Sequence, residues 1–325
     1  MAFTSSQAAT WDLLVETAYD RAVEYALRDD PTWRAVVDTK PTAQAMPGDV
    51  VTMSFISDMA LATTPLNELT DVTPPGQAPP TRINITLNEY GNADNHTERL
   101  RQLAFVNPDP EIAEVLGRNQ NDSLDAVIRA IVDPANFVLY RNSGNLVSSA
   151  AGNVAATNNL IVAADVATAK TVTAAVALMR RRKVRPRMGN MYTAMIHPDV
   201  VFDLMTEAPS ANAWILPHAY VDTQEIYKGE VGTYQGARYI STTRISSANN
   251  TVPVKVYLTY FIGKQALAEA VGGNGLGEPK TVVGLQTDLL KRFYPVGWKA
   301  LLGWAIYRQE AIQIMRTTSS LQGLA

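Results

Sequence analysis

The sequence His197-Pro198-Asp199 places an imidazole two residues from a carboxylate. Such a pair could transfer protons or help to bind a metal ion. The same residues also fit a strand that ends and a helix that begins, because proline and aspartate are common in the first helical turn. The chain has three histidines and no second ligand motif beside this one, so we favour the structural interpretation.

A glycine-rich stretch, Gly272-Gly273-Asn274-Gly275-Leu276-Gly277, could cradle a phosphate group. Its spacing matches neither the dinucleotide fingerprint nor the lysine-bearing phosphate loop, so we interpret it as a connector. The chain has no cysteine, which excludes disulfides, zinc–thiolate sites and thiol catalysis. No serine-hydrolase or metalloprotease signature is present. We therefore expect no catalytic residue, no metal and no cofactor.

Six cations gather over a short stretch of the chain: Arg180, Arg181, Arg182, Lys183, Arg185 and Arg187. They could contact DNA, or they could contact an acidic surface of another subunit. They could also simply end a helix, where each cation stabilises the C-terminal dipole by about 0.3–1 kcal/mol. The sequence leaves these three interpretations open.

The composition argues against a protein that binds nucleic acid over its whole surface. The formal net charge of the 325 residues is −3, whereas phosphate-binding proteins carry a basic excess. Charged residues make up 18% of the chain, below the roughly 25% of ordinary soluble domains. A surface poor in charge is typical of a protein covered by partners. No apolar stretch approaches the length of a membrane span, and the first residues do not resemble a secretion signal.

Alternating side chains predict two strands, over residues 48–60 and 82–88. The connector between them is rich in proline and can be neither helix nor central strand. A two-stranded ribbon is at best marginally stable alone, so we expect it to lie on a neighbouring copy of the chain. The residues predicted to make that contact are Val51, Met53, Phe55, Pro74, Pro75, Ile83, Ile85 and Leu87.

Helical patterns cover residues 10–29, 109–133 and 165–183, with Asp165 as the expected cap of the last helix. Residues 142–160 are rich in Asn, Ser and Gly and predict a loop. An α/β pattern follows, with strands expected at 191–196, 238–242 and 254–260, a helix at 198–205, and strand-like runs over 296–315. The chain therefore has mixed α and β structure.

Three segments are more specific: IHPDVVFDL at 196–204, GEVGTYQGARYISTT at 229–243, and GLGEPKTVVGLQTDLLKRFYPVGWKALLG at 275–303. With the order arm, ribbon, long helix, α/β region and final strands, they resemble the major capsid proteins of tailed bacteriophages. The resemblance covers about residues 46 to 318 and implies the α+β Hong Kong 97-type capsid fold. The implied divisions are an N-arm (1–47), an extended β-hairpin loop (48–105), a peripheral domain with a spine helix (106–140), an axial domain (141–275) and a return to the peripheral domain (276–325).

The resemblance implies a structural protein rather than an enzyme. Copies would form hexamers and pentamers of an icosahedral head around double-stranded DNA, assembled in the bacterial cytoplasm. The implied partners are the chain itself, a separate scaffolding protein, a portal and a possible decoration protein, with no membrane. The alternatives are an encapsulin-like compartment, which neighbouring genes would distinguish, and a soluble α/β enzyme, which would need a convergent polar pocket.

Two departures from the type member of this fold are visible. That protein crosslinks a lysine of its extended loop to an asparagine of a neighbour, whereas this chain has no lysine between Lys40 and Lys170. We therefore expect a head without covalent crosslinks. The type member also begins with a long segment that is later cleaved, whereas helical pattern begins here near residue 10. We therefore expect a separate scaffolding protein.

Overall fold

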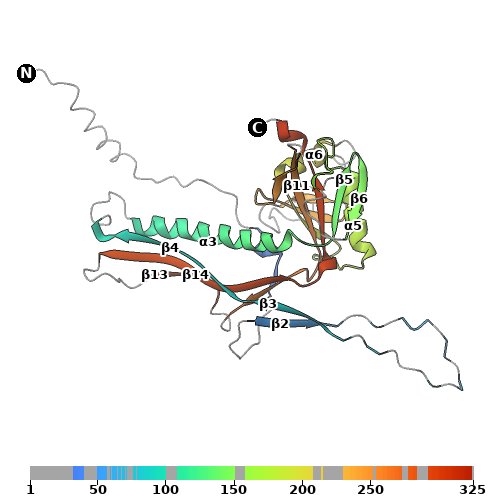
Figure 1. Ribbon diagram of the computed structural model, residues 1–325, viewed down its shortest axis with the longest axis horizontal. Coiled ribbons are helices and arrows are strands. Elements are labelled where there is room, and N and C mark those ends of the chain that lie inside the picture. Colours follow the sequence, from blue (N-terminus) through green and yellow to red (C-terminus); the bar gives the residue numbers. More distant parts are fainter. Residues whose placement is uncertain are drawn as a thin grey trace, which may run out of the picture.

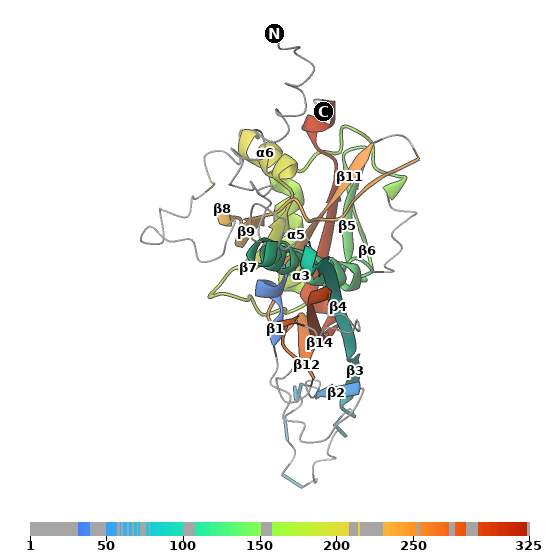
Figure 2. The ribbon, with the colours of Figure 1, turned by 90° about the vertical axis from the view of Figure 1, so that its left-hand side faces the viewer.

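The computed structural model shows an elongated platform joined to a compact body, with an extended ribbon that projects from them (Figures 1 and 2). The structure describes residues 32–39, 50–56, 59, 61–63, 65–66, 68–69, 71, 76–77, 79–99, 108–150, 158–207, 214, 230–251, 254–272, 277–283 and 292–323. The helix expected over residues 10–29 lies outside these ranges, as do the expected contact residues Pro74 and Pro75. None of the helices within the described ranges combines the length and apolar character needed to cross a membrane.

The compact body is built on a mixed sheet in which eight of the described strands take part. In spatial order these are β6 (Asn145–Ser149), β5 (Val138–Asn142), β15 (Ile312–Thr317), β11 (Lys255–Ile262), β7 (Tyr192–Ile196), β9 (Ala237–Ser241) and β8 (Glu230–Tyr234), with β10 (Ser247–Asn249) paired to β11. All but the first residue of β11 are buried. Such a continuous apolar run is typical of a strand covered on both faces.

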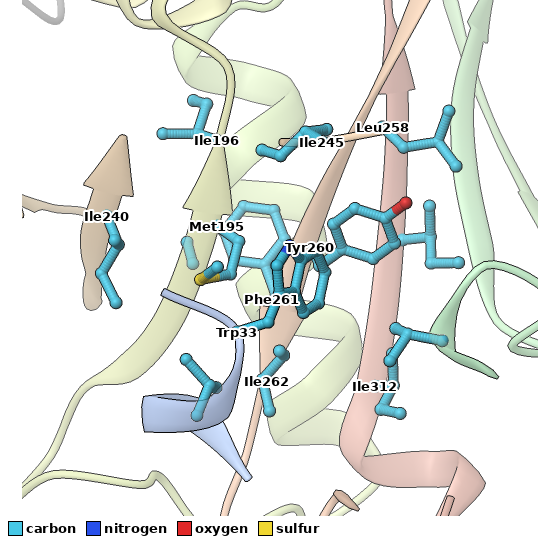
Figure 3. Close-up of a cluster of buried hydrophobic side chains, with 14 of the residues drawn as sticks. Trp33, Met195, Ile196, Ile240, Ile245, Leu258, Tyr260, Phe261, Ile262 and Ile312 are labelled. Atoms are coloured by element: carbon cyan, nitrogen blue, oxygen red, sulfur yellow. The ribbon is translucent and has the colours of Figure 1, made fainter. Parts of the chain in front are cut away.

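The core of the body lies between this sheet and its helices. Helix α5 (Ala169–Arg181) packs on β5 and β15, and helix α6 (Pro198–Thr206) follows β7. Tyr260 and Phe261 of β11 lie in the centre, together with Trp33 from the N-terminal part of the chain (Figure 3). The rings of Trp33 and Tyr260 meet edge to face, with 5.0 Å between their centroids.

The platform is a second sheet whose central strand is β14 (Phe293–Ile306). Strand β4 (Asn88–Thr97) pairs along one edge of β14 over ten residues. The other edge carries β12 (Leu267–Val271) and β13 (Lys280–Val283), and β1 (Asp38–Thr39) extends the sheet beside β12.

The predicted long helix is present as α3 (Pro108–Val132), which lies over β4 and β14 (Figure 1). It passes through Gly117 without a break. At 1.5 Å per residue it is about 37 Å long. Asn119 fixes it to the sheet, because its Oδ1 accepts hydrogen bonds from Trp298 Nε1 and Asn92 Nδ2, both at 3.1 Å.

The ribbon consists of β2 (Val50–Phe55) and β3 (Thr81–Thr86), which confirms the two predicted strands. They pair antiparallel, with Val51 opposite Ile85 and Met53 opposite Ile83. This register places the apolar residues of both strands on one face.

The prediction of a loop over residues 142–160 is wrong in its first part, because β5 and β6 form a hairpin there. Its turn consists of Ser143 and Gly144, both with positive φ. Such a turn suits the twist of a hairpin. The polar composition of β6 concealed a strand that tertiary pairing imposes.

Asp165 does not cap α5, although the sequence suggested this. The helix begins four residues later, where the Thr168 hydroxyl accepts the Thr171 N–H and forms a capping box. The buried Asp165 carboxylate instead accepts the N–H groups of Ser143 at 3.1 Å and Gly144 at 2.8 Å. These hydrogen bonds therefore fix the β5–β6 turn beside the residues that precede α5.

The expected division into residues 141–275 and 276–325 also needs correction. Strand β12, from the first range, belongs to the platform sheet. Strand β15, from the second, lies in the compact body between β5 and β11. The chain thus enters the platform directly after β11 and returns to the body at β15.

Candidate assembly surfaces

The base of the ribbon rests on its own subunit. Val51 and Ile85 are buried against Ala268, Ala270 and Tyr307 of the same chain. The prediction that a neighbouring copy covers Val51 and Ile85 is therefore wrong. The reason is the continuation of the ribbon into β4, whose long pairing with β14 holds the ribbon base over β12.

Four further apolar residues of the ribbon, Met53, Phe55, Ile83 and Leu87, are only partly buried against this cluster. The Phe55 ring meets the Tyr307 ring at 5.6 Å between centroids. The Tyr307 hydroxyl donates to a carbonyl of β2 at 3.3 Å. Each of the four keeps part of its surface open, so their contact with a neighbour stays a prediction.

The described residues beyond β2 lead away from both sheets (Figure 1). We call the described residues between 56 and 80 the ribbon tip. Its large apolar side chains are strongly exposed: Ile56 64%, Met59 57%, Leu61 84%, Leu66 78% and Leu69 93%. Large apolar side chains concentrated on one exposed segment are typical of a surface that a partner covers.

A short N-terminal segment, residues 32–39, fastens the platform to the compact body, and we call it the interdomain clasp. Arg34 binds both carboxylate oxygens of Glu269, at 2.8 and 3.2 Å, and also reaches Glu278 at 2.7 Å. Glu269 is fully buried, and its Oε2 also accepts the Trp304 indole N–H at 2.9 Å. The hydrogen bond to Glu269 raises the pKa of Arg34. The buried carboxylate is thus paired and hydrogen-bonded.

The same clasp reaches into the compact body. The Trp33 side chain is fully buried there. The Thr32 N–H donates to Asp125 Oδ2 of α3 at 3.1 Å, and Asp38 pairs with Arg187 at 3.2 Å. The clasp therefore connects platform, spine helix and body through adjacent residues.

Carboxylates of α3 connect that helix to the body. Arg244 pairs with Asp122 at 2.5 Å and with Asp125 at 3.5 Å. Asp133, just after the helix, accepts a hydrogen bond from the hydroxyl of Tyr260 in the core. Burial raises the pKa of both Asp125 and Tyr260. These contacts fix the angle between the spine helix and the body sheet.

The structure confirms the structural interpretation of His197. Its imidazole Nδ1 caps α6 by accepting the Asp199 N–H at 3.2 Å, and Pro198 occupies the first turn. The Tyr257 hydroxyl donates to Asp199 Oδ2 at 2.5 Å, and burial lowers the pKa of His197. Throughout the described ranges, no group of three or more acidic, histidine or cysteine side chains could hold a metal ion.

The six cations between residues 180 and 187 divide into two groups. Arg182 donates to Gln313 Oε1 at 2.7 Å and lies 4.0 Å above the Phe137 ring, and burial lowers the pKa of Arg182 to about 10. Arg187 pairs with Asp38. These two side chains are therefore held within their own subunit, and a DNA or subunit contact of either one stays a prediction. The exposed members are Arg180, Arg181, Lys183 and Arg185.

Comparison with known protein families shows to which family this chain belongs. A family model described as phage capsid protein matches residues 5–312. The chain belongs to the phage capsid protein family. No curated protein sequence matches it.

Solved structures show the same fold at low sequence identity. The capsid of Ralstonia phage GP4 is 12% identical with a TM-score of 0.69, and the match covers 93% of this chain and 94% of that one. The capsid of cyanophage Pam1 is 13% identical with a TM-score of 0.65, with 93% and 96% covered. The head structure of Helicobacter pylori bacteriophage KHP40 gives 13%, a TM-score of 0.62, and 92% and 94% covered. The fold is therefore the α+β Hong Kong 97-like capsid fold.

Family and fold together identify the role of the chain. It is a structural protein, a major capsid protein that builds the icosahedral head of a phage. Its working site is therefore a set of surfaces rather than a pocket.

The interdomain clasp is the part of the structure that sequence reasoning missed. The sequence places these residues only within the N-arm (1–47) that the resemblance implies, and it predicts no contact for them. A signal was nevertheless present, since Trp33, Val36 and Val37 are apolar residues close together in a polar context. All three are buried.

Proposed function

We propose that copies of this chain form hexamers and pentamers that close into an icosahedral head around double-stranded DNA. In this proposal the ribbon tip lies on the adjacent subunit. One observation carries it: the ribbon tip exposes five large apolar side chains away from its own sheets. Full burial of a leucine contributes about 1.5–3 kcal/mol, so such a segment gains strongly from a partner surface.

Within each capsomer, we assign the compact body to the centre and the platform to the contacts between capsomers. Two parts joined by a rigid clasp suit this arrangement, because closed symmetry requires each subunit to present its interfaces at fixed angles. The remaining partners follow from the same role: a separate scaffolding protein, a portal, a possible decoration protein and the enclosed DNA. Assembly takes place in the bacterial cytoplasm, and no chemical reaction is required of the subunit.

Photo-crosslinking tests where the ribbon tip lies. We would replace Leu66 with a photoreactive phenylalanine derivative and irradiate assembled particles. The expected product is a covalent dimer or higher multimer on a denaturing gel. A matched variant carries the same group in place of Tyr307, an aromatic residue that is buried in its own subunit, and we expect mainly monomers from it. Particles in which Leu66 reacts only within its own chain would contradict the proposal.

A further inference from the structure

The exposed cations near the end of α5 form a continuous basic edge of the compact body. We define the basic edge as Arg180, Arg181, Lys183, Arg185 and Lys264, all of them exposed. Lys264 comes from the turn between β11 and β12, and its N–H donates to the Arg185 carbonyl at 2.9 Å. We propose that the basic edge contacts the phosphate backbone of the DNA enclosed by the head. This inference rests on the proposed function, since it requires DNA inside the particle.

Backbone hydrogen bonds fix the conformation of the basic edge. After α5 the Lys183 N–H donates to the Arg180 carbonyl at 2.9 Å, and the Val184 N–H donates to the Met179 carbonyl at 3.2 Å. Lys183 has a φ of 56°, the left-handed conformation that this helix ending requires. The backbone thus satisfies the last carbonyls of the helix. The cationic side chains are not needed to cap it and can bind another group.

Two cations of the same stretch serve as anchors. Arg182 is held by Gln313 and Phe137, and Arg187 by Asp38 and two carbonyls of the clasp at 3.4 Å. They fix both ends of the segment to the core, so the exposed cations between and beside them need little ordering when they bind. Preorganisation of this kind lowers the cost of association.

The charge of the basic edge is not neutralised by the described part of its own chain. Among the ion pairs between described residues, none involves the five side chains of the edge. The whole chain nevertheless carries a net charge of −3, so the residues outside the basic edge have a net negative charge. A polyanion is therefore attracted more strongly to this edge than to the average of the remaining surface.

The side chains at the edge favour DNA over a protein partner. Arginine is common at protein interfaces as well, but such interfaces are also anchored by aromatic and apolar residues and are depleted in lysine. No large exposed apolar side chain of the described residues lies at 180–187 or 264–265. Contacts to a phosphate backbone use arginine and lysine and need no apolar anchor.

A salt titration measures the contact directly. One variant carries Arg180→Gln, Arg181→Gln, Lys183→Gln and Arg185→Gln. A matched control replaces four other exposed cations with glutamine, namely Arg82, Lys170, Lys280 and Lys299. The affinity of unassembled full-length subunits for a short DNA duplex is measured against salt concentration. Each lost phosphate contact lowers the slope of log affinity against log salt by about 0.9.

We expect the basic-edge variant to lose about 3 to 4 units of slope and the control variant to lose less than about 1. An unchanged slope in the basic-edge variant, or an equal loss in the control, would overturn the inference.

Chemical labelling then locates the edge in the particle. The chain contains no cysteine, so Lys183→Cys creates a single reactive thiol. A bulky polymer-linked maleimide should fail to label it in intact heads and label it in opened ones. Labelling of intact heads would place the edge outside and refute the inference while leaving the capsid assignment intact. Failure of the Leu66 crosslink, in contrast, would refute the ribbon contact on which the proposed assembly depends.

Discussion

Serine at three positions of the ribbon tip tests the role of its apolar side chains. The variant carries Leu61→Ser, Leu66→Ser and Leu69→Ser. Each of these leucines is at least 78% exposed in the subunit, so none contributes much to its own fold. If a neighbour buries each of them, each contributes about 2 kcal/mol to the subunit contact, and the three together about 6 kcal/mol.

A loss of about 6 kcal/mol corresponds to about four orders of magnitude in association. Light scattering and electron microscopy of purified subunits over a concentration series measure the concentration at which shells form. We expect the serine variant to form no shells at concentrations where the unmodified chain assembles fully. The unfolding free energy should change by less than about 0.5 kcal/mol per position, because the side chains are solvent-exposed in the subunit.

A second variant with methionine at the same three positions retains the apolar surface. We expect it to assemble at lower concentrations than the serine variant, since methionine keeps the apolar character and approximate volume of leucine. Normal assembly of the serine variant would refute the reasoning. So would a large fall in its thermal stability, because the leucines would then belong to the core of their own subunit.

Three further predictions concern the clasp, the α6 cap and the finished head. Arg34→Met leaves the buried Glu269 without its cation, so it should lower the unfolding free energy measured in denaturant titrations by about 3 kcal/mol. Glu278→Gln removes a half-exposed partner of Arg34 and should lower it by less than about 1 kcal/mol. Equal effects of the two substitutions would contradict the role of the Arg34–Glu269 pair in the clasp. Burial lowers the pKa of His197 from 6.5, so the unfolded chain binds the proton more readily and stability should fall as the pH drops below about 6.5. His197→Asn can still cap α6, and we expect it to reduce this pH dependence; an unchanged profile would exclude His197 as its source. Denaturing gels of mature heads should show monomers, since no lysine lies between Lys40 and Lys170, and a ladder of multimers would disprove this.

The sequence predicts those elements whose side chains alternate or repeat clearly. Strand β2 follows from the alternation of Val51, Met53 and Phe55, and α3 follows from its apolar stripe despite Gly117. Helix α6 follows from the local signal His197-Pro198-Asp199. In each case the local preference and the tertiary structure agree.

Strand β4 shows why other elements escape such reasoning. Its sequence, NEYGNADNHT, is polar and contains a glycine, so it carries no strand pattern. It is a strand because β14 pairs with it over ten residues. The sequence also does not predict that the chain passes from the body sheet to the platform sheet at β12 and back at β15. Local sequence does not encode which strands become neighbours.

The candidate surfaces divide in the same way. Alternation correctly places Val51 and Ile85 on the apolar face of the ribbon, but it cannot tell whether that face meets its own subunit or a neighbour. Likewise the cluster of cations is visible in the sequence, whereas the internal roles of Arg182 and Arg187 depend on Gln313 and Asp38, which are distant in the chain. The composition identifies apolar or charged segments. Only the fold decides which of their side chains stay exposed for contact with a partner.

Electron cryo-microscopy of heads assembled from this chain tests most directly whether the subunit completes its surface by contact with its own copies. We expect the density to show the ribbon tip lying across an adjacent subunit, with Leu66 and Leu69 buried there and exposed only in the isolated chain. Density in which the tip folds back on its own platform, or leaves both leucines in solvent within a closed head, would contradict that claim.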